Sequence, residues 1–374
     1  MHWQWITDIR EFKRVSEDWD KLLVESEEDN PFLLSAFHIA WWKHVSSGLA
    51  LRFLIFYENG RIIGGVPLIL DKRRNLGFPG GVAANYTEPL CLATQRHIIW
   101  QGILEALQQA DDWHSFNLER VRRTRFDMET KDKKILCDIY PAEYAYLAKI
   151  PHDFDGFSGK LSQKLRYYVR RSEKEFAKLG KISLYAIKDP VELDAFVDKF
   201  FAFSRGSFKR RASISLFENE RFCGFFRELV KNFLQVGFLD SQALKLDEKT
   251  IAIHFGYSLG KNLNYIFPAF DMDYADLNPG HLMIYKLFEL GAKRKNTYFD
   301  FYSGYSFYKK QWSDTREDIL TLKAYRRSVS GRIDYFLKKK IRKAFPAVKI
   351  KEKLRAHQGL FRVAKKIRGL VYKK

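Results

Sequence analysis

The segment Asn278-Pro279-Gly280-His281 combines residue types that begin an α-helix with a residue that leaves an anion room to bind. Asparagine is a favoured N-cap, proline suits the first helical position, and the apolar sequence LMIYKLFEL follows at once. Gly280 has no side chain where a phosphate would approach, and the N–H groups and dipole of a helix start favour negative charge. The segment therefore predicts a phosphate anchor, and an ordinary capped helix is the alternative.

Two polar residues within apolar strand patterns are candidates for proton transfer. His254 lies in the run Thr250–Tyr257, and Asp300 alternates with Phe299 and Phe301. An imidazole with a pKa near neutrality suits a general base. A carboxylate in an aromatic strand has to be paired or in contact with water. A hydrogen-bonded core histidine and a structural carboxylate are the alternatives.

The basic stretch LSQKLRYYVRRSEKEF over residues 161–176 predicts a helix that brings cationic and aromatic side chains close together. Arg166 and Arg170 are the candidates for holding a phosphorylated or otherwise anionic substrate, because charged donors make strong hydrogen bonds to such groups. An amphipathic helix that only faces solvent is the alternative.

Residues 332–374 form the most basic part of the chain. They contain 16 lysines and arginines against two acids, which supplies +14 of the net charge of +20. Apolar residues recur there at helical spacing, at Ile350, Leu354, Phe361, Ala364, Ile367 and Val371. The pattern predicts an interfacial helix on an anionic membrane, with a flexible tail and RNA contact as alternatives. We expect removal of this tail to leave the thermal stability of the folded part unchanged.

The elements that must position these residues occur twice along the chain. In the first half, the runs Leu51–Tyr57 and Arg61–Leu70 flank Asn59-Gly60, a dipeptide typical of a hairpin turn. The second half has a similar hairpin, and a gap-free alignment of the two places Gly65 opposite His254. The first half therefore lacks the imidazole.

The remaining elements follow in the same order in both halves. Helices are expected at Val15–Glu27, Ser35–Val45, Gln95–Gln109, Pro190–Phe203, Leu216–Phe233 and Gly280–Lys293, and strands at Ser115–Val121, Lys134–Ile139, Ala243–Leu246, Thr250–Tyr257, Leu263–Phe270, Thr297–Tyr302 and Ile319–Tyr325. Each half then has the order β-α-α-β-β-β-α-β-α-β, which indicates one α/β unit used twice with a boundary near Pro151–Lys160.

The composition excludes several classes of protein. With 374 residues and 46% hydrophobic residues, the chain has enough apolar material for a large core, which excludes global disorder. No run of 18 apolar residues predicts a membrane span, and the N-terminal sequence MHWQWITDIREF does not resemble a signal peptide. The three scattered cysteines form neither a disulfide framework nor a zinc motif, so a reducing cytoplasm is expected.

The order of elements is similar to that of the GNAT acyltransferase fold, and the second half resembles the CelD-like acetyltransferase family of bacterial exopolysaccharide and cellulose gene clusters. The residues that carry this resemblance are Phe270-Asp271-Met272-Asp273-Tyr274, Asn278-Pro279-Gly280-His281-Leu282, Phe299-Asp300-Phe301, Gly304, Tyr308-Lys309 and Trp312. It extends over about residues 10–325. Two such domains in tandem are also similar to Fem-type peptidyl transferases, in which the basic helix has a counterpart.

The resemblance implies an acyl-CoA co-substrate whose diphosphate lies at Asn278-Pro279-Gly280-His281. It places the thioester where the strand Leu263–Phe270 separates from the strand Thr297–Tyr302. Pro268 suits an edge or a bulge there, because proline cannot donate to a neighbouring strand. The first half has Ala93-Thr94-Gln95 in place of the Pro-Gly pair, so the second half is expected to hold the chemistry.

The resemblance also implies roles for three residues after the last of these strands. Tyr305 and Tyr308 are expected to begin a short helix, Tyr308 as the group that protonates the thiolate and Tyr305 as a substrate contact. Lys309 is expected to stabilise the oxyanion or a substrate phosphate. A chance tyrosine and a solvated surface lysine are the alternatives.

We therefore predict tandem GNAT-like α/β domains with mixed central sheets flanked by helices. A non-catalytic domain is expected over 1–155, a catalytic domain over 156–330, and a polybasic, helical and amphipathic tail over 331–374. The predicted activity is acyl transfer from acetyl-CoA or another acyl-CoA, without a metal, to an amino group of a sugar, polysaccharide precursor or small amine in exopolysaccharide or cell-envelope biosynthesis. The expected location is the cytoplasm or the inner face of the plasma membrane. A Fem-type transferase that uses aminoacyl-tRNA and an inactive membrane-associated adaptor are the alternatives.

Overall fold

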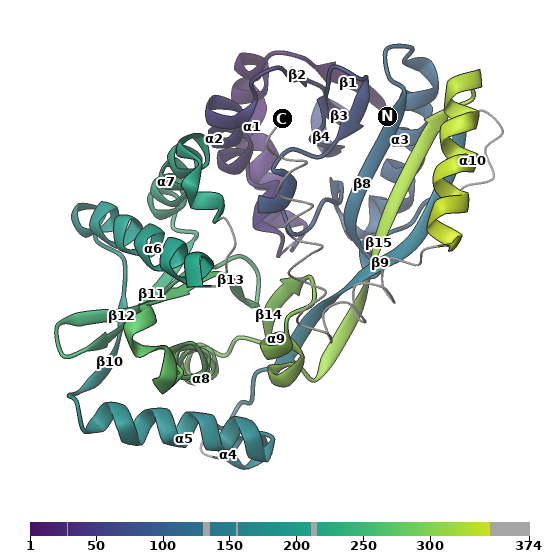
Figure 1. Cartoon of the computed structure of the whole chain (residues 1–374). Helices are drawn as coiled ribbons and strands as arrows, with labels where there is room; N and C mark the ends of the chain where they lie inside the picture. Colours follow the sequence, from purple (N-terminus) through teal and green to yellow (C-terminus); the bar gives the residue numbers. More distant parts are fainter. Residues whose placement is uncertain (28, 130–134, 155, 211–214, 345–374) are drawn as a thin grey trace. The chain divides into compact units, whose positions relative to one another are not determined.

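The computed structural model describes residues 1–27, 29–129, 135–154, 156–210 and 215–344 (Figure 1). Its described residues divide into two units, Met1–Ala145 with residues 317–344, and Tyr146–Arg316. The strands β9 (Ile135–Lys149) and β15 (Thr315–Arg326) belong partly to each unit. This division differs from the predicted boundaries at 155/156 and 330/331, because β15 pairs with a strand of the first unit. The order of strands in a sequence does not fix which sheet each strand joins.

The first unit repeats the predicted α/β order with several short additional strands. Its elements are β1 (His2–Ile6), α1 (Ile9–Glu25), η1 (Pro31–Leu33), α2 (Ser35–Val45), β2 (Ala50–Leu51), β3 (Phe53–Glu58), β4 (Arg61–Val66), β5 (Ile69–Leu70), β6 (Asn75–Gly77), η2 (Gly81–Ala83), β7 (Leu90–Cys91), η3 (Ala93–Gln95), α3 (Arg96–Gln109), β8 (Ser115–Arg122), η4 (Arg123–Arg125), most of β9 and β15, and α10 (Val329–Ala344). One sheet has the strand order β1-β3-β4-β7, and a second places β8 between β15 and β6.

The hairpin between β3 and β4 forms as predicted. Asn59 and Gly60 both have left-handed backbone conformations, with φ of 49° and 77°. Such turns match the right-handed twist of the two strands that they join, which explains the preference for Asn-Gly.

The second unit contains the predicted three-stranded meander. Its elements are the end of β9, α4 (Phe157–Lys160), α5 (Gln163–Ala177), β10 (Ile182–Ala186), α6 (Pro190–Arg210), η5 (Leu216–Glu218), α7 (Glu220–Gln235), β11 (Leu239–Leu246), β12 (Lys249–Tyr257), β13 (Leu263–Phe270), η6 (Met272–Leu277), α8 (Pro279–Lys293), β14 (Tyr298–Ser303), α9 (Phe307–Trp312) and the start of β15. Strands β10 to β13 pair antiparallel in sequence order, and β14 pairs parallel with β13.

Helices cover both faces of this sheet. The phenylalanine-rich helices α6 and α7 pack on one face, where Phe200 and Phe226 contact Phe255 of β12. Helix α8 packs on β12 and β13 from the other face and is itself covered by α5. The predicted α/β class, with mixed sheets flanked by helices, is confirmed.

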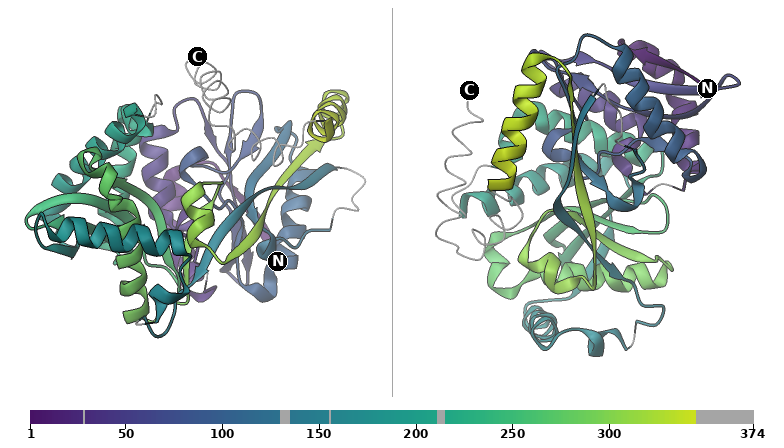
Figure 2. Two further views of the ribbon diagram at one scale, coloured as in Figure 1. Left: turned by 60° about the horizontal axis from the view of Figure 1, so that its bottom comes forward. Right: turned by 90° about the vertical axis from the view of Figure 1, so that its right-hand side faces the viewer.

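Helix α10 shows that the predicted tail begins as part of the first unit (Figure 2). Asp334 contacts Nε2 of His114 at 3.2 Å, and Arg342 pairs with Asp138 of β9 at 2.6 Å. Truncation at residue 332 removes both contacts and is therefore expected to lower stability, contrary to the sequence-based expectation. Residues 345–374, with the predicted stripe from Ile350 to Val371, lie outside the described residues. Among the described helices, none is long and apolar enough to cross a bilayer.

Candidate active site in the second unit

Strands β13 and β14 are paired over only a short stretch. The register joins Leu263 to Phe299 and Asn264 to Asp300, after which both strands continue without further pairing to each other. We call this separation the β13–β14 opening. Pro268 pairs with His254 of β12 and lies beyond the part of β13 that pairs with β14, a position where a strand tolerates proline.

A β-bulge in β13 shapes one wall of the opening. The register with β12 shifts between Phe255 and Tyr257, so that an extra residue of β13 is accommodated between Asn264 and Phe267. Gly256 lies at the bulge, where a Cβ atom would be 2.5 Å from the carbonyl oxygen of Asn264. The bulge changes the alternation of the strand, which brings the Tyr265 ring onto the face that carries His254.

His254, in the middle of β12, is 1% exposed and stacks on Tyr265 with ring centroids 4.7 Å apart. Neither ring nitrogen has a hydrogen-bond partner among the described residues. Burial lowers the pKa of His254 to about 4, although Asp240 and the backbone of Asn264 oppose the shift. The imidazole is therefore neutral at neutral pH and able to accept a proton, but it is a weak base.

The first-unit residue that shares the orientation of His254 is Gly64 rather than Gly65. A Cβ atom on Gly65 would lie 2.7 Å from Trp19 of α1, and one on Gly64 would lie 2.7 Å from Ile99 of α3. His254 faces away from the core formed by α6 and α7 and lies on the side of α8. In the order of elements, α3 of the first unit corresponds to α8 of the second. Gly64, which faces α3, is therefore the equivalent of His254. The first unit has glycine at either position, so it lacks the imidazole as predicted.

His254→Phe is expected to reduce the loss of stability in acid. The folded-state pKa of about 4 lies below the ordinary value of 6.5, so the stabilisation from the neutral ring is complete above pH 6.5 and declines as the pH falls toward 4. At pH 5 the loss is about 2 kcal/mol for one such group. Denaturant unfolding at pH 7 and pH 5 measures this difference, and phenylalanine retains the stacking on Tyr265.

His38 of α2 gives a matched test in the first unit. It lies among aromatic rings, and burial lowers its pKa to about 3. His38→Phe should reduce the acid sensitivity of the first unit by a similar amount. Unchanged pH dependence in both variants would contradict this account.

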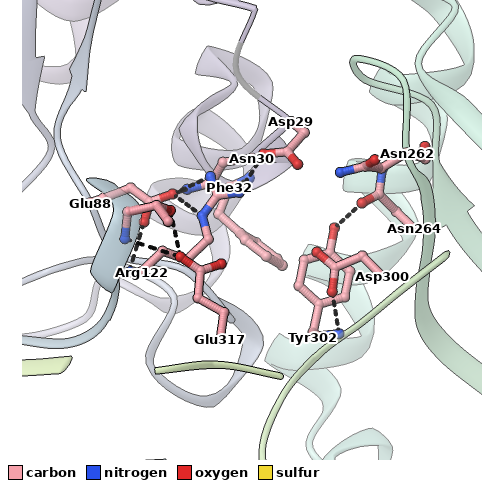
Figure 3. A network of polar contacts seen from close by, with 11 residues as sticks. Asp29, Asn30, Phe32, Glu88, Arg122, Asn262, Asn264, Asp300, Tyr302 and Glu317 are labelled. Carbon is pink, nitrogen blue, oxygen red and sulfur yellow. Dashed lines mark hydrogen bonds and ion pairs between the residues drawn. The ribbon is translucent and has the colours of Figure 1, made fainter. Parts of the chain in front are cut away.

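Asp300 is buried in β14 and accepts a hydrogen bond from the backbone N–H of Tyr302 at 2.6 Å (Figure 3). This contact supports a left-handed conformation at Tyr302, whose φ is 60°. The Tyr302 hydroxyl donates to Oδ1 of Asn264 at 2.9 Å, and the Asn264 amide donates to the Tyr257 carbonyl at 2.9 Å. An aromatic residue in this conformation costs about 1–3 kcal/mol, so the network holds a strained turn where β13 and β14 separate. Asp300 thus has the backbone donor that a structural carboxylate needs, and its role as a proton acceptor stays a prediction.

Lys309 anchors the turn that follows β14. Its Nζ donates to the carbonyl oxygens of Ser303 at 2.9 Å and Tyr302 at 3.4 Å. Helix α9 begins at Phe307, so Tyr305 precedes the helix that it was expected to begin. The reason is local, because Ser306 is extended, with φ of −141° and ψ of 145°.

Tyr308 connects α9 to both strands of the opening. Its half-buried ring makes edge contacts with Tyr265 of β13 and Phe301 of β14, with both centroid distances at 6.3 Å. Tyr305 is half-buried in the turn before α9. Tyr265 thus links His254 and Tyr308 on one face of the β13–β14 opening, whereas Asp300 alternates with Phe299 and Phe301 and lies on the opposite face of β14. Lys309 lies over the turn that follows β14.

The start of α8 differs in detail from the predicted cap. Asn278 occupies the N-cap position and Pro279 the first helical position, but Asn278 is left-handed, with φ of 54°, and its side chain makes no capping hydrogen bond. Its carbonyl instead accepts from the N–H groups of His281 at 3.1 Å and Leu282 at 3.3 Å. Pro279 has no N–H, so in this described turn the N–H of Gly280 is the backbone donor that remains for a ligand.

His281 supplies a further donor at the same place. Nδ1 of His281 accepts from the Trp312 indole at 2.9 Å, and its ring stacks on Tyr168 of α5 with centroids 5.1 Å apart. Burial, aided by the charge of Lys164, lowers the pKa of His281 to about 4. A neutral ring that accepts at Nδ1 carries its proton on Nε2, so His281 presents an N–H at the first turn of α8.

Helix α5 lies against this helix start. Ser172 donates to the Leu277 carbonyl at 2.6 Å, and Lys164 lies over the Phe307 ring at 5.3 Å. The predicted substrate residues Arg166 and Arg170 line an open depression of about 820 Å³ along α5. A terminal nitrogen of the Arg166 guanidinium donates to the Leu161 carbonyl at 3.4 Å. The Nε atom of the same side chain is buried and has no hydrogen-bond partner among the described residues.

Sequence reasoning missed four residues that shape this site, namely Asn264, Tyr265, Tyr302 and Tyr168. Asn264 could have been found as a polar residue in an otherwise apolar strand. The other three depend on the bulge, the left-handed turn and the packing of α5, which leave no mark in the local sequence. In the described part of the chain, no cluster of three His, Cys, Asp or Glu side chains is placed to hold a metal ion.

Comparison with known proteins assigns the second unit to a class. Residues 163–310 match the family model described as "Acetyltransferase (GNAT) domain". This match lies within the second unit and supports an acyltransferase domain of the GNAT type there. No curated protein matches the chain.

Several solved structures share the fold over most of the chain at low sequence identity. The chain is similar to FemX, at 12% identity and a TM-score of 0.61, over 90% of this chain and 99% of that one. It is similar to the C-terminal domain of a lysylphosphatidylglycerol synthetase of Agrobacterium fabrum, at 10% identity, a TM-score of 0.55 and coverage of 87% and 95%. It is also similar to L-PGS of Bacillus licheniformis, at 15% identity, a TM-score of 0.54 and coverage of 87% and 95%. Identities at this level show the fold alone.

Proposed function

We propose that the second unit transfers an acyl group from acyl-CoA to an amino group at the β13–β14 opening. The observation that carries this proposal is the short pairing of β13 and β14 beside the α8 helix start, within a GNAT acetyltransferase domain. The free edge of β13 offers backbone groups to a thioester, and the turn after β14 brings Tyr308 to the same place.

The proposed chemistry is a single acyl transfer. The amine nitrogen attacks the thioester carbonyl carbon, the new C–N bond forms, and the C–S bond breaks. The amine loses a proton, and the departing thiolate gains one from the Tyr308 hydroxyl. His254 and Asp300 are the proposed proton acceptors. Because the pKa of His254 is about 4, transfer to it would accompany the attack rather than precede it.

The turnover rate of the variant His254→Phe shows whether His254 or Asp300 accepts the proton of the amine. A loss of turnover at an unchanged melting temperature at pH 7 would support His254 as the base. Unchanged turnover would exclude His254 and leave Asp300.

The residues at the start of α8 fit the anionic part of the donor. Gly280 contributes a backbone N–H, His281 contributes the Nε2 proton, and Lys164 places a positive charge near the His281 ring. Acyl-CoA supplies the activated acyl group when it is bound, and these side chains would orient it.

Gly280→Glu is expected to weaken acyl-CoA binding at least tenfold, about 1.4 kcal/mol. The substitution adds bulk and negative charge beside the proposed anion site. A Cβ atom at Gly280 would meet only the Phe270 ring, at 3.6 Å, so the variant should fold. Calorimetric titration with acyl-CoA measures the effect. Gly159→Glu is the matched control, because a Cβ atom there meets nothing within 4 Å.

We further propose that the acceptor is an amino sugar, a polysaccharide precursor or a small amine of cell-envelope or exopolysaccharide biosynthesis, as the resemblance to the CelD-like family implies. Incubation of the purified protein with acetyl-CoA and a panel of such amines, with product mass measured, tests this. Tight acyl-CoA binding without transfer to any of them would contradict it.

A second candidate is a Fem-type transferase that uses aminoacyl-tRNA. It is favoured by the depression along α5, whose lining combines Arg166, Arg170, Arg171 and Lys174 with the exposed ring of Tyr167. Cationic side chains with an exposed aromatic ring suit a nucleic acid backbone and its bases. Transfer that requires charged tRNA, without detectable acyl-CoA binding, would establish this candidate. Binding of neither donor would support the inactive adaptor.

A further inference from the structure

Helix α10 is attached to the first unit by its polar side. Gly331, Asp334, Tyr335 and Arg342 face inward, where Asp334 contacts His114 and Arg342 pairs with Asp138. An amphipathic helix on a globular domain ordinarily buries its apolar stripe instead. Helix α10 therefore turns its polar side, rather than its apolar side, toward the first unit. Figure 2 shows the helix beside β9 and β15.

The outward side of α10 carries a continuous apolar stripe. Its members, between 52% and 78% exposed, are Val329, Ile333, Phe336, Leu337 and Ile341. Their spacing of three or four residues places them along one side of the helix. Large apolar side chains gathered in this way on a surface mark a site of interaction.

The charges around the stripe indicate what it contacts. Helix α10 contains six lysines and arginines and a single acid, Asp334, which is already paired with Lys338. The sequence that follows, residues 345–374, adds ten lysines and arginines against one acid. A second copy of the chain would bring two such positive regions together, so self-association through this stripe is disfavoured.

We propose that α10 docks the protein on an anionic lipid bilayer, with the stripe inserted at the interface and the basic side chains at the headgroups. Ile333, Phe336 and Leu337 supply the apolar contact, and Lys340 lies among them with a stem long enough to carry its charge to the headgroups. Each lysine or arginine near an anionic leaflet strengthens the attraction. This site is distinct from the predicted stripe of residues 350–371 and does not depend on the proposed acyl transfer.

Vesicle sedimentation with the full-length protein tests the proposal. Vesicles of phosphatidylcholine with phosphatidylglycerol should bind the protein, and vesicles of phosphatidylcholine alone should bind it weakly. At about 1 M salt, where exposed charges are screened beyond about 3 Å, a fraction should remain bound through the stripe. The double variant Ile333→Gln/Phe336→Gln keeps every charge and should lower this salt-resistant binding at least about tenfold.

The control removes apolar groups of the same kind elsewhere in the first unit. Val24 and Ile98 are 58% and 50% exposed, and Val24→Gln/Ile98→Gln should bind vesicles as the wild type does. A variant that ends at residue 344 should keep the salt-resistant fraction and lose part of the binding at low salt. Equal binding by the stripe variant and the wild type would overturn the proposal. A dimer of the wild type that the stripe variant abolishes would assign the stripe to a second copy and overturn it as well.

Discussion

Arg122→Ala is expected to lower the free energy of unfolding of the first unit by about 3–5 kcal/mol, because it leaves buried carboxylates without their partner. Arg122 is buried at the end of β8, where its Nε donates to Glu88 at 2.8 Å and its guanidinium pairs with Asp29 at 2.5 Å (Figure 3). The guanidinium also lies 4.5 Å from the centre of the Tyr86 ring. Asn30 adds an amide donor to Glu88 at 3.3 Å, but it cannot neutralise the charge.

The pH dependence of this variant distinguishes a lost ion pair from a lost packing contact. Burial alone would raise the pKa of Asp29, but the Arg122 guanidinium, together with the charge of Arg125 and a backbone hydrogen bond, lowers that pKa below the ordinary value of 3.8. In the wild type, this contribution is complete above pH 3.8 and is lost as the pH falls through the lowered pKa. In Arg122→Ala the Asp29 carboxylate loses the guanidinium that lowers its pKa and takes up a proton more readily, so the deficit should shrink as the pH falls from 7 toward 5.

Chemical denaturation of the two proteins at both pH values gives the comparison. Arg123→Ala is the control, because Arg123 is the next residue and is exposed, and its effect should stay within about 0.5 kcal/mol. A deficit that does not change with pH would assign the effect to packing and contradict the ion-pair explanation.

The parts of the fold that sequence predicted well depend on local chemistry. Asn59-Gly60 forms the hairpin turn because both residues accept a left-handed conformation. Pro279 begins α8 because its fixed φ and missing N–H suit the first helical position. The alternation of Asp300 with Phe299 and Phe301 placed a carboxylate within an aromatic strand, and the hydrogen bond from Tyr302 agrees with the stated alternative of a structural carboxylate.

The parts that sequence did not predict depend on partners far along the chain. β15 joins β8, more than a hundred residues earlier, and this pairing moves α10 into the first unit. The bulge at Tyr265 requires Gly256 on the neighbouring strand, and the left-handed Tyr302 requires Asn264. A residue's type does not reveal such partners, so the wall of the site could not be derived from local patterns.

Tyr308→Phe is expected to lower turnover by roughly 10²–10⁴ while leaving acyl-CoA affinity and the melting temperature unchanged. Phenylalanine keeps the edge contacts of the ring with Tyr265 and Phe301 and removes only the hydroxyl. If that hydroxyl protonates the leaving thiolate, its loss acts on the transition state and not on the bound donor, so turnover falls and affinity does not.

Steady-state kinetics with calorimetric titration of acyl-CoA separate these two quantities. Tyr298→Phe is the matched control. It also removes one tyrosine hydroxyl, but Tyr298 is the first residue of β14, at the end of that strand away from α9. A fall in affinity as large as the fall in turnover would show that Tyr308 binds the donor rather than protonating it. Unchanged turnover would exclude its hydroxyl and leave Tyr305 or Lys309 as the proton donor, since Tyr305 lies in the turn before α9 and Lys309 in the helix itself, donating back to that turn. Lys309 already donates to the carbonyl oxygens of that turn, so Lys309→Met would then lower stability together with turnover, whereas Tyr305→Phe would lower turnover alone.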